Sequence, residues 1–247
     1  SLRWSLNDWR LSLTGTYGQS RTSFLGDTYL NDALASSAGG RYDNRSITGE
    51  LAADGRLFAL PGGPAKLALG AGVRQNDFSL FRGAGAIQNI DTSQNVLYAY
   101  GELSLPVISP DQGLSFVRRL RFSGALRYER YRGIADVVTP KLGVIYAPSE
   151  AIDLKGTWGR SFRAPSFIQR YQVQQALLYP ATTFGGGAYP AGSTALLRVG
   201  GNPELKPEKA QSWSATLALH PPSLAGIDVE FSYFSTRYVD RIVNPIP

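Results

Sequence analysis

The sequence predicts an all-β fold: an antiparallel up-and-down transmembrane β-barrel, of which this chain supplies about nine strands of a larger barrel. Apolar and polar residues alternate with period two, the pattern of a strand with one apolar face. The alternating segments run about 10 to 15 residues, whereas strands of soluble proteins typically have about 5 or 6. A tilted strand that crosses a bilayer needs about 9 to 11 residues, so the segment length favours a membrane barrel.

The first four expected strands cover residues 9–20, 43–58, 65–78 and 95–105. Each places leucines on one face and mainly small, polar or charged residues on the other. Between the second and the third, Leu60-Pro-Gly-Gly-Pro64 predicts a tight turn, because proline fixes φ and glycine accepts positive φ. The leucines of these apolar faces are Leu11 and Leu13, Leu51 and Leu57, Leu67 and Leu69, and Leu97, Leu103 and Leu105.

The other five expected strands cover residues 119–130, 137–147, 152–162 and 211–219, with a last strand from residue 227 onward. The strand 119–130 alternates most strictly. Leu120, Phe122 and Leu126 share one face, and the opposite face carries Arg121 and Arg127. The first face is expected to contact lipid and the second to line the lumen.

The connections between these strands alternate in length. Residues 59–64, 148–151 and 220–226 are short, whereas residues 21–42, 79–94 and 163–210 are long. Short periplasmic turns and long extracellular loops are typical of bacterial outer-membrane barrels. Residues 106–118 and 131–136 depart from this rhythm. Aromatic residues near the strand ends fit an interfacial girdle: Trp9, Tyr17, Tyr128, Trp158, Phe162 and Trp213.

Composition excludes several classes of protein. The chain has no cysteine, so disulfide frameworks and thiolate metal sites are excluded within it. No apolar run approaches the roughly 18 residues of a membrane-spanning helix. The net charge of +6 comes from scattered residues, and no basic and aromatic platform for nucleic acid is present. Because the sequence starts at Ser1 and contains no methionine, we expect residues 1–247 to be a segment of a longer precursor.

Few residues suggest chemistry. His220, the only histidine, could act as a general base, but it abuts two prolines at an expected turn and is interpreted as a solvated turn residue. We therefore predict no catalytic residues, no cofactor and no metal site. Carboxylates in or near the long connections leave calcium binding open: Asp27, Asp32, Asp77 and Asp91. Gly83-Ala-Gly85 has only the first two glycines of a dinucleotide fingerprint and is interpreted as loop.

Two motifs flank the longest connection. Gly159-Arg-Ser-Phe-Arg-Ala-Pro-Ser-Phe167 ends one strand, and Gly201-Asn-Pro-Glu-Leu-Lys-Pro-Glu208 precedes the next. In this order and strand context, they resemble the barrel of TonB-dependent outer-membrane receptors. We interpret both motifs as structural signatures, because Pro165, Pro203 and Pro207 would stiffen the loop where it leaves the wall.

The resemblance implies a bacterial outer-membrane protein. Members of this family have a 22-stranded barrel with an N-terminal plug, and they take up iron chelates, cobalamin or saccharides with energy from TonB. This sequence shows neither a plug nor a TonB box, and no closing C-terminal strand. The implied partners are outer-membrane lipid, lipopolysaccharide and an unknown nutrient. TonB would act only through an N-terminal region outside this sequence, and nucleic acid is not expected.

The loop 163–210 is the predicted site of nutrient binding. Arginine pairs with carboxylate or phosphate through two parallel hydrogen bonds, and tyrosine offers rigid contact area with a polar tip. An anionic or aromatic nutrient would suit such a mouth. The predicted contributors are Arg163, Arg170, Tyr171, Tyr179, Tyr189 and Arg198. A poorly ordered surface loop is the alternative.

Three other classes of protein remain open from the sequence. A passive porin would share the barrel but lack a plug. A soluble β-sheet binding module would not need strands of this length. An outer-membrane enzyme would need a catalytic set at the cell surface, whereas His220 lies at the opposite end.

Overall fold

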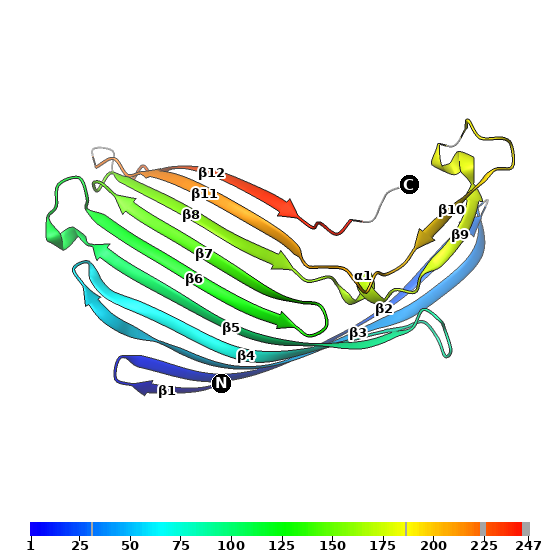
Figure 1. The fold of residues 1–247 in the computed structure, drawn as a ribbon, viewed down its shortest axis with the longest axis horizontal. Helices are drawn as coiled ribbons and strands as arrows, with labels where there is room; N and C mark the ends of the chain where they lie inside the picture. Colours follow the sequence, from blue (N-terminus) through cyan, green and yellow to red (C-terminus); the bar gives the residue numbers. More distant parts are fainter. Residues whose placement is uncertain (31, 186, 223–225, 244–247) are drawn as a thin grey trace.

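The computed structural model describes residues 1–30, 32–185, 187–222 and 226–243. Ten strands form one antiparallel sheet in the order β1-β2-β3-β4-β5-β6-β7-β8-β11-β12, curved into an open trough (Figure 1). Every strand pairs with its neighbours in sequence, except that β8 pairs with β11 across an insertion. The sheet strands are β1 (Leu2–Leu6), β2 (Trp9–Leu30), β3 (Ala33–Leu60), β4 (Gly63–Phe81), β5 (Ile90–Ile108), β6 (Arg119–Tyr131), β7 (Ala135–Ala147), β8 (Ile152–Arg163), β11 (Glu208–Leu219) and β12 (Val229–Val239).

The expected all-β antiparallel fold is confirmed, and the sheet is open, as a part of a barrel should be. All nine expected strands are present. The tenth, β1, pairs with β2 from Leu2↔Leu13 to Leu6↔Trp9. Its five residues are too few for a period-two pattern to stand out in the sequence.

Of the expected long loops, residues 21–42 are largely strand and residues 79–94 are half strand, so the prediction of these segments as loops is wrong there. The pairing of β2 with β3 continues up to Leu30↔Ala33, through nearly all of residues 21–42. The pairing of β4 with β5 reaches Leu80↔Ile90, which leaves only residues 82–89 unpaired. In these extensions charged residues such as Arg21 take positions of the apolar face, whereas aromatic residues such as Phe24 and Tyr42 take positions of the polar face, and this change in the alternation concealed the strands.

Ion pairs across and along the strands stabilise the sheet where these extensions begin. The Nε of Arg21 lies 2.5 Å from Oδ1 of Asp43, whose Oδ2 lies 2.7 Å from Nε of Arg41. The Nη2 of Arg45 lies 2.7 Å from Oδ2 of Asp77. Opposite charges that face each other across a strand pair stabilise a sheet in place of apolar contacts.

The insertion 163–210 has its own secondary structure. It contains α1 (Phe167–Tyr171), β9 (Gln175–Pro180), a short 3-10 helix (Ala181–Phe184) and β10 (Thr194–Val199). Strands β9 and β10 form a separate two-stranded sheet at the end of the trough opposite the short turns (Figure 1). Another 3-10 turn, Pro110–Gln112, lies between β5 and β6 at the opposite end. None of the helices in the described ranges has the length and apolar character to cross a membrane.

The buried core is small and lies at the end of the sheet that carries α1. It consists of Phe78, Leu80 and Ile90, with Phe24, Tyr42, Phe167 and Ile168 packed against it. A few apolar side chains on the opposite face, such as Val96 and Val137, are also buried, but many large apolar side chains are exposed along one face of the sheet. Examples are Leu51, Leu69, Leu97, Leu126, Leu142, Trp213 and Phe231.

Candidate functional site

The two faces of the sheet differ in chemistry because the register is continuous. Strand pairing places Leu51, Leu69 and Leu126 on one face, here called the apolar face. The opposite face, here called the polar face, carries most of the hydrogen-bonded and ion-paired side chains. In transmembrane β-barrels the polar face lines the interior.

A network of tyrosines and charged groups occupies the middle of the polar face. The hydroxyls of Tyr98 and Tyr100 donate to the two carboxylate oxygens of Glu50, at 2.9 and 3.1 Å. The guanidinium of Arg127 lies over both rings, 4.7 and 5.7 Å from their centroids, and donates to Glu129 at 2.5 Å. Arg74 lies 3.5 Å from the other oxygen of Glu129. These contacts hold the side chains against the wall.

Glycines of β4 allow the tyrosines to lie flat. A Cβ at Gly72 would come within 2.6 Å of the Tyr98 hydroxyl, and a Cβ at Gly70 would overlap the Tyr100 ring. Both rings therefore cross β4 at its glycines and reach Glu50 on β3. A flat ring leaves more room in the lumen than one that projects into it.

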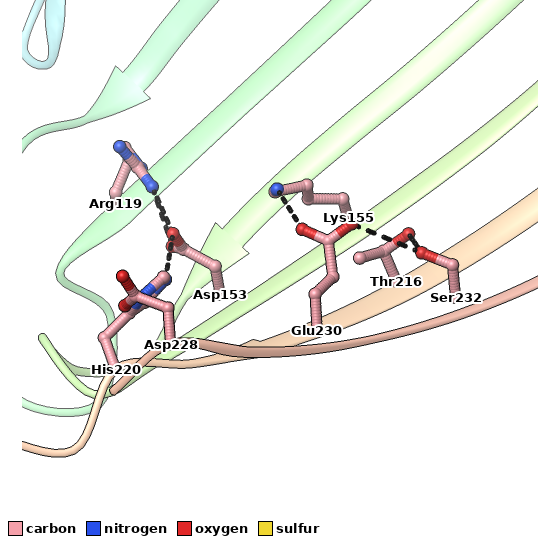
Figure 2. Close-up of polar contacts among 8 residues, drawn as sticks. All are labelled: Arg119, Asp153, Lys155, Thr216, His220, Asp228, Glu230 and Ser232. Atoms are coloured by element: carbon pink, nitrogen blue, oxygen red, sulfur yellow. Dashed lines mark hydrogen bonds and ion pairs between the residues drawn. The ribbon is translucent and has the colours of Figure 1, made fainter. Parts of the chain in front are cut away.

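A second polar cluster lies at the end with the short turns (Figure 2). Arg119 donates to both oxygens of Asp153, at 2.7 and 2.8 Å. The Nδ1 of His220 lies 2.6 Å from Oδ1 of Asp228, and its Nε2 lies 3.6 Å from Asp153. His220 thus joins β8 to the turn before β12 and is not merely a solvated turn residue.

Along β8, β11 and β12 this cluster continues toward the middle of the sheet. The Nζ of Lys155 lies 3.3 Å from Glu230, and the hydroxyls of Thr216 and Ser232 lie 2.8 Å apart (Figure 2). These are contacts between charged or hydroxyl groups, and no thiol is present in the chain. In the part of the chain that the structure describes, no group of three or more His, Asp or Glu side chains could hold a metal ion. The arrangement suits a polar wall.

The insertion starts at α1, which follows the first sequence motif. Ser166 caps this helix: its hydroxyl accepts from the N–H of Gln169, and the Gln169 side chain accepts from the N–H of Ser166. Phe167 then stacks on Phe78, with ring centroids 5.4 Å apart. Tyr42 and Phe24 extend this aromatic stack across β3 and β2.

The second motif wraps around Arg170 of α1. The Nε and Nη2 of Arg170 donate to the carbonyl of Pro203 at 3.2 and 2.9 Å, and Nη2 reaches the carbonyl of Gly133 at 3.4 Å. The side of α1 approaches so closely that a Cβ at Gly201 would lie 2.6 Å from the Arg170 carbonyl. The second motif therefore holds α1, the helix that begins at the last residue of the first motif.

An ion pair closes the base of the insertion. The Nε of Arg163, the last residue of β8, lies 2.6 Å from Oε2 of Glu208, the first residue of β11. The backbone N–H of Ile242 donates to the other oxygen of Glu208 at 2.6 Å. Hydrogen bonds from Arg163 and then from Ile242 lower the pKa of Glu208 below its ordinary value.

The six residues predicted to bind nutrient lie in different settings. Arg170 is only 8% exposed and stacks on Tyr171 at 5.0 Å, whereas Tyr189 is 68% exposed. Tyr179 packs edge-on against Phe184 on the β9–β10 hairpin, and the exposed Arg198 of that hairpin donates to Gln174 at 3.3 Å. The side chain of Arg163 is 60% exposed beside Glu208. The structure thus brings Arg170 to Tyr171 and fixes Arg170 as a support for the loop.

The sequence interpretation missed the aromatic stack at the mouth. Phe24, Tyr42 and Phe78 occupy polar-face positions, where the alternation calls for polar residues. Aromatic residues at these positions depart from the alternation, and this departure could have indicated an aromatic cluster. It was hidden because Phe24 and Tyr42 fell in a segment expected to be loop.

Comparison with known proteins identifies the family. Residues 1–246 match the family model described as TonB dependent receptor-like, beta-barrel. The chain belongs to the TonB-dependent receptor β-barrel family. Among curated protein sequences, none matches this chain. The family is one of receptors and transporters, in agreement with the two sequence motifs.

Solved structures of such receptors share the fold. The siderophore receptor PirA from Acinetobacter baumannii superimposes with a TM-score of 0.70 at 14% identity, over 97% of this chain and 34% of that one. A mutant of the ferric enterobactin receptor from Pseudomonas aeruginosa, in complex with enterobactin, gives 0.70 at 16% identity, over 96% and 34%. The RagAB peptide transporter gives 0.61 at 11% identity, over 99% and 30%. The chain thus spans about a third of these structures.

Proposed function

We propose that this chain forms part of the wall and mouth of an outer-membrane receptor that imports a scarce nutrient with energy from TonB. The family match over residues 1–246 is the observation that carries this proposal. A plug and further strands would come from regions outside this sequence. The apolar face would contact outer-membrane lipid and lipopolysaccharide, and the polar face would line the lumen.

The sidedness of the proposal follows from the turns. Connections 61–62 and 148–151 lie at one end of the sheet, as do Leu219 at the end of β11 and Val229 at the start of β12, and the insertion with α1 and the β9–β10 hairpin lies at the other end (Figure 1). Short turns face the periplasm in bacterial outer-membrane barrels, and elaborated loops face the outside. The insertion and the aromatic stack therefore form the extracellular mouth.

The mouth favours an anionic nutrient with aromatic groups, such as an iron chelate. Phe24 and Tyr42, whose side chains are half-buried, stack beside the buried Phe78, and the guanidinium of Arg82 lies 5.1 Å from the Phe24 centroid. Aromatic faces and arginine forks together match aromatic, anionic ligands. Siderophore and ferric enterobactin receptors among the structural neighbours support this class, whereas the peptide transporter keeps others open.

Within the predicted set, the exposed side chains are the ones available to ligand: Arg163, Tyr171, Tyr179, Tyr189 and Arg198. Arg170 contributes by holding α1 under the mouth, because its donors are taken by backbone carbonyls. The proposal thus assigns contact to the β9–β10 hairpin and support to α1.

Uptake by living cells tests the proposal. A strain that lacks the chromosomal receptor would carry the full-length gene, in TonB-positive and TonB-negative backgrounds. Uptake of labelled ferric siderophores, cobalamin and oligosaccharides would be compared at limiting concentration. Saturable uptake of one class that requires TonB supports the proposal. Equal passive entry in both backgrounds would instead indicate a porin.

A further inference from the structure

A group of three cations on the apolar face has no role in the proposed transport. Arg160 on β8, Gln211 on β11 and Arg237 on β12 stand in one cross-strand row, and Lys209 lies in the next row toward the mouth. The side chains of Arg160, Lys209 and Arg237 are exposed. Neighbouring strands are about 4.8 Å apart, so Arg160 and Arg237 stand roughly 10 Å apart across the row.

These cations differ from the other arginines that face outward at this level. Arg21, Arg41, Arg45 and Arg130 each lie within 4 Å of an aspartate, namely Asp43, Asp77 or Asp136. Within the described ranges, by contrast, Arg160, Lys209 and Arg237 form no ion pair with a carboxylate. The outward arginines of β2, β3 and β6 are therefore neutralised by aspartates, whereas the cations of β8, β11 and β12 retain their positive charge.

The backbone provides a recess for this charge. Strands β7 and β8 pair only from Lys141↔Gly159 to Tyr146↔Leu154, so they separate beyond Pro140. Proline has no N–H for the ladder, which ends the pairing there. A depression of about 380 Å³ is lined by residues of β7, β8, β11 and β12, including all three cations.

The recess also has two acidic groups on its border, and neither cancels the charge. Asp136 is engaged, 3.5 Å from Arg130 and 2.9 Å from the donating hydroxyl of Tyr128. Asp240 lines the recess without an ion pair among the described residues. With Asp136 offset by Arg130, three cations face one carboxylate, and the recess is positive.

Directly below the cations lies an apolar, aromatic surface. Trp158 and Trp213 face each other across β8 and β11, with ring centroids 6.4 Å apart, one outward position below Arg160 and Gln211. Phe231 and Tyr233 continue this surface on β12, and both are exposed. A lipid with anionic phosphates at the surface and acyl chains below would meet complementary groups at both levels.

We propose that Arg160, Lys209 and Arg237 form a binding site for the phosphorylated headgroup of one outer-leaflet lipid, whose acyl chains pack on Trp158 and Trp213. Arginine pairs with phosphate through a bidentate fork, and lysine contributes a point charge. This inference rests on the proposed outer-membrane location but not on the nature of the nutrient. The site faces away from the lumen and is separate from the mouth.

Native mass spectrometry of the full-length receptor in detergent tests the site. The probes are bisphosphorylated lipid A and the same lipid without its phosphates, each added at defined ratio. The site variant combines Arg160→Gln, Lys209→Gln and Arg237→Gln. The matched control combines R21Q, R41Q and R45Q, which removes three outward arginines that are already paired with aspartates.

The wild type and the control should retain one bisphosphorylated lipid A, with weaker binding of the dephosphorylated form. The site variant should lose at least about tenfold in affinity, since each surface cation contributes on the order of 1 kcal/mol toward anionic lipid. Equal loss in both variants, or equal binding of both lipids by the wild type, would overturn the proposal.

Recovery of folded receptor from the outer-membrane fraction is checked first by its heat-modifiable migration. That control separates the two proposals, because a protein absent from the outer membrane would contradict the proposed function. Normal insertion and uptake without phosphate-dependent lipid binding would contradict only the lipid site.

Discussion

Arg170 should hold the extracellular insertion on the barrel through hydrogen bonds to backbone carbonyls. Its guanidinium is buried, with two contacts to the Pro203 carbonyl at 3.2 and 2.9 Å and a longer one to Gly133 at 3.4 Å. In Arg170→Met the side chain keeps much of its apolar contact but loses every donor. A hydrogen bond to a charged group contributes roughly 1.5–3 kcal/mol, and the long Gly133 contact adds little.

The free energy that opposes local opening of the insertion should therefore fall by about 2–4 kcal/mol. Because about 1.4 kcal/mol is a factor of ten, amide protection in the insertion should fall by roughly 30- to 1000-fold. Hydrogen exchange of the purified full-length receptor measures this directly. Two reporters are the N–H of Gly201, which donates to Gln172, and the N–H of Asn202, which donates to Gln169.

The control is Arg198→Met on the same insertion, since that arginine is exposed and, among the described residues, hydrogen-bonds only to Gln174, at 3.3 Å. It should change protection less than about threefold, because surface substitutions usually alter stability by no more than about 0.5 kcal/mol. The barrel strand β6 should keep its protection in both variants. Equal protection in Arg170→Met and wild type would refute the supporting role of Arg170, as would an equal loss in both variants.

Three further perturbations test other parts of the account. Phe122→Arg on the apolar face should lower the free energy of unfolding of the receptor by about 2–4 kcal/mol, as measured by reversible denaturant unfolding in lipid vesicles. Phe122→Leu should cost less than about 1.5 kcal/mol. Equal losses in the two variants would place this residue away from lipid. Gly70→Ala should cost about 1–3 kcal/mol by forcing the Tyr100 ring aside, and Gly49→Ala, where a Cβ meets nothing within 4 Å, should cost much less. Hydrogen bonding lowers the pKa of Glu208 in the folded state. The ionised carboxylate should therefore stabilise the insertion fully above the unfolded pKa of about 4.3, and this stabilisation should be lost as pH falls through the lower folded pKa. Hydrogen exchange should show lower amide protection of the insertion in acid, and Glu208→Gln should abolish that dependence on pH.

The sequence was sufficient to predict the strands in the part of the sheet that crosses the bilayer, because one face of each strand must be apolar there. Strict alternation on β6 and β7 located both strands to within two residues of their bounds, because burial against lipid dictates the residue type at every second position. Beyond the bilayer that constraint ends. The extension of β2 and β3 is held by Arg21, Asp43 and Arg41, and such pairs look like ordinary loop residues in a sequence.

The candidate site was less accessible from the sequence for a related reason. Arg170 and Arg198 have the same side chain and lie in the same insertion, yet one is buried and the other exposed. Only the packing of α1 against residues 201–203 distinguishes them, and that packing joins segments about thirty positions apart. Whether an arginine in a loop supports the fold or is available to ligand thus depends on tertiary contacts, which the alternation pattern and the composition of the sequence do not reveal.

Sidedness in the outer membrane is the claim on which the assignments of mouth, lumen and lipid face all depend. The chain contains no cysteine, so single cysteines can be placed in the full-length receptor with no background from this segment. Gly187→Cys lies in the insertion, where the glycine is exposed and a Cβ meets nothing within 4 Å, and Ser149→Cys lies in the exposed turn before β8. A membrane-impermeant maleimide should label Gly187→Cys on intact cells and Ser149→Cys only after the outer membrane is permeabilised. Labelling of Ser149→Cys but not of Gly187→Cys on intact cells would contradict the account.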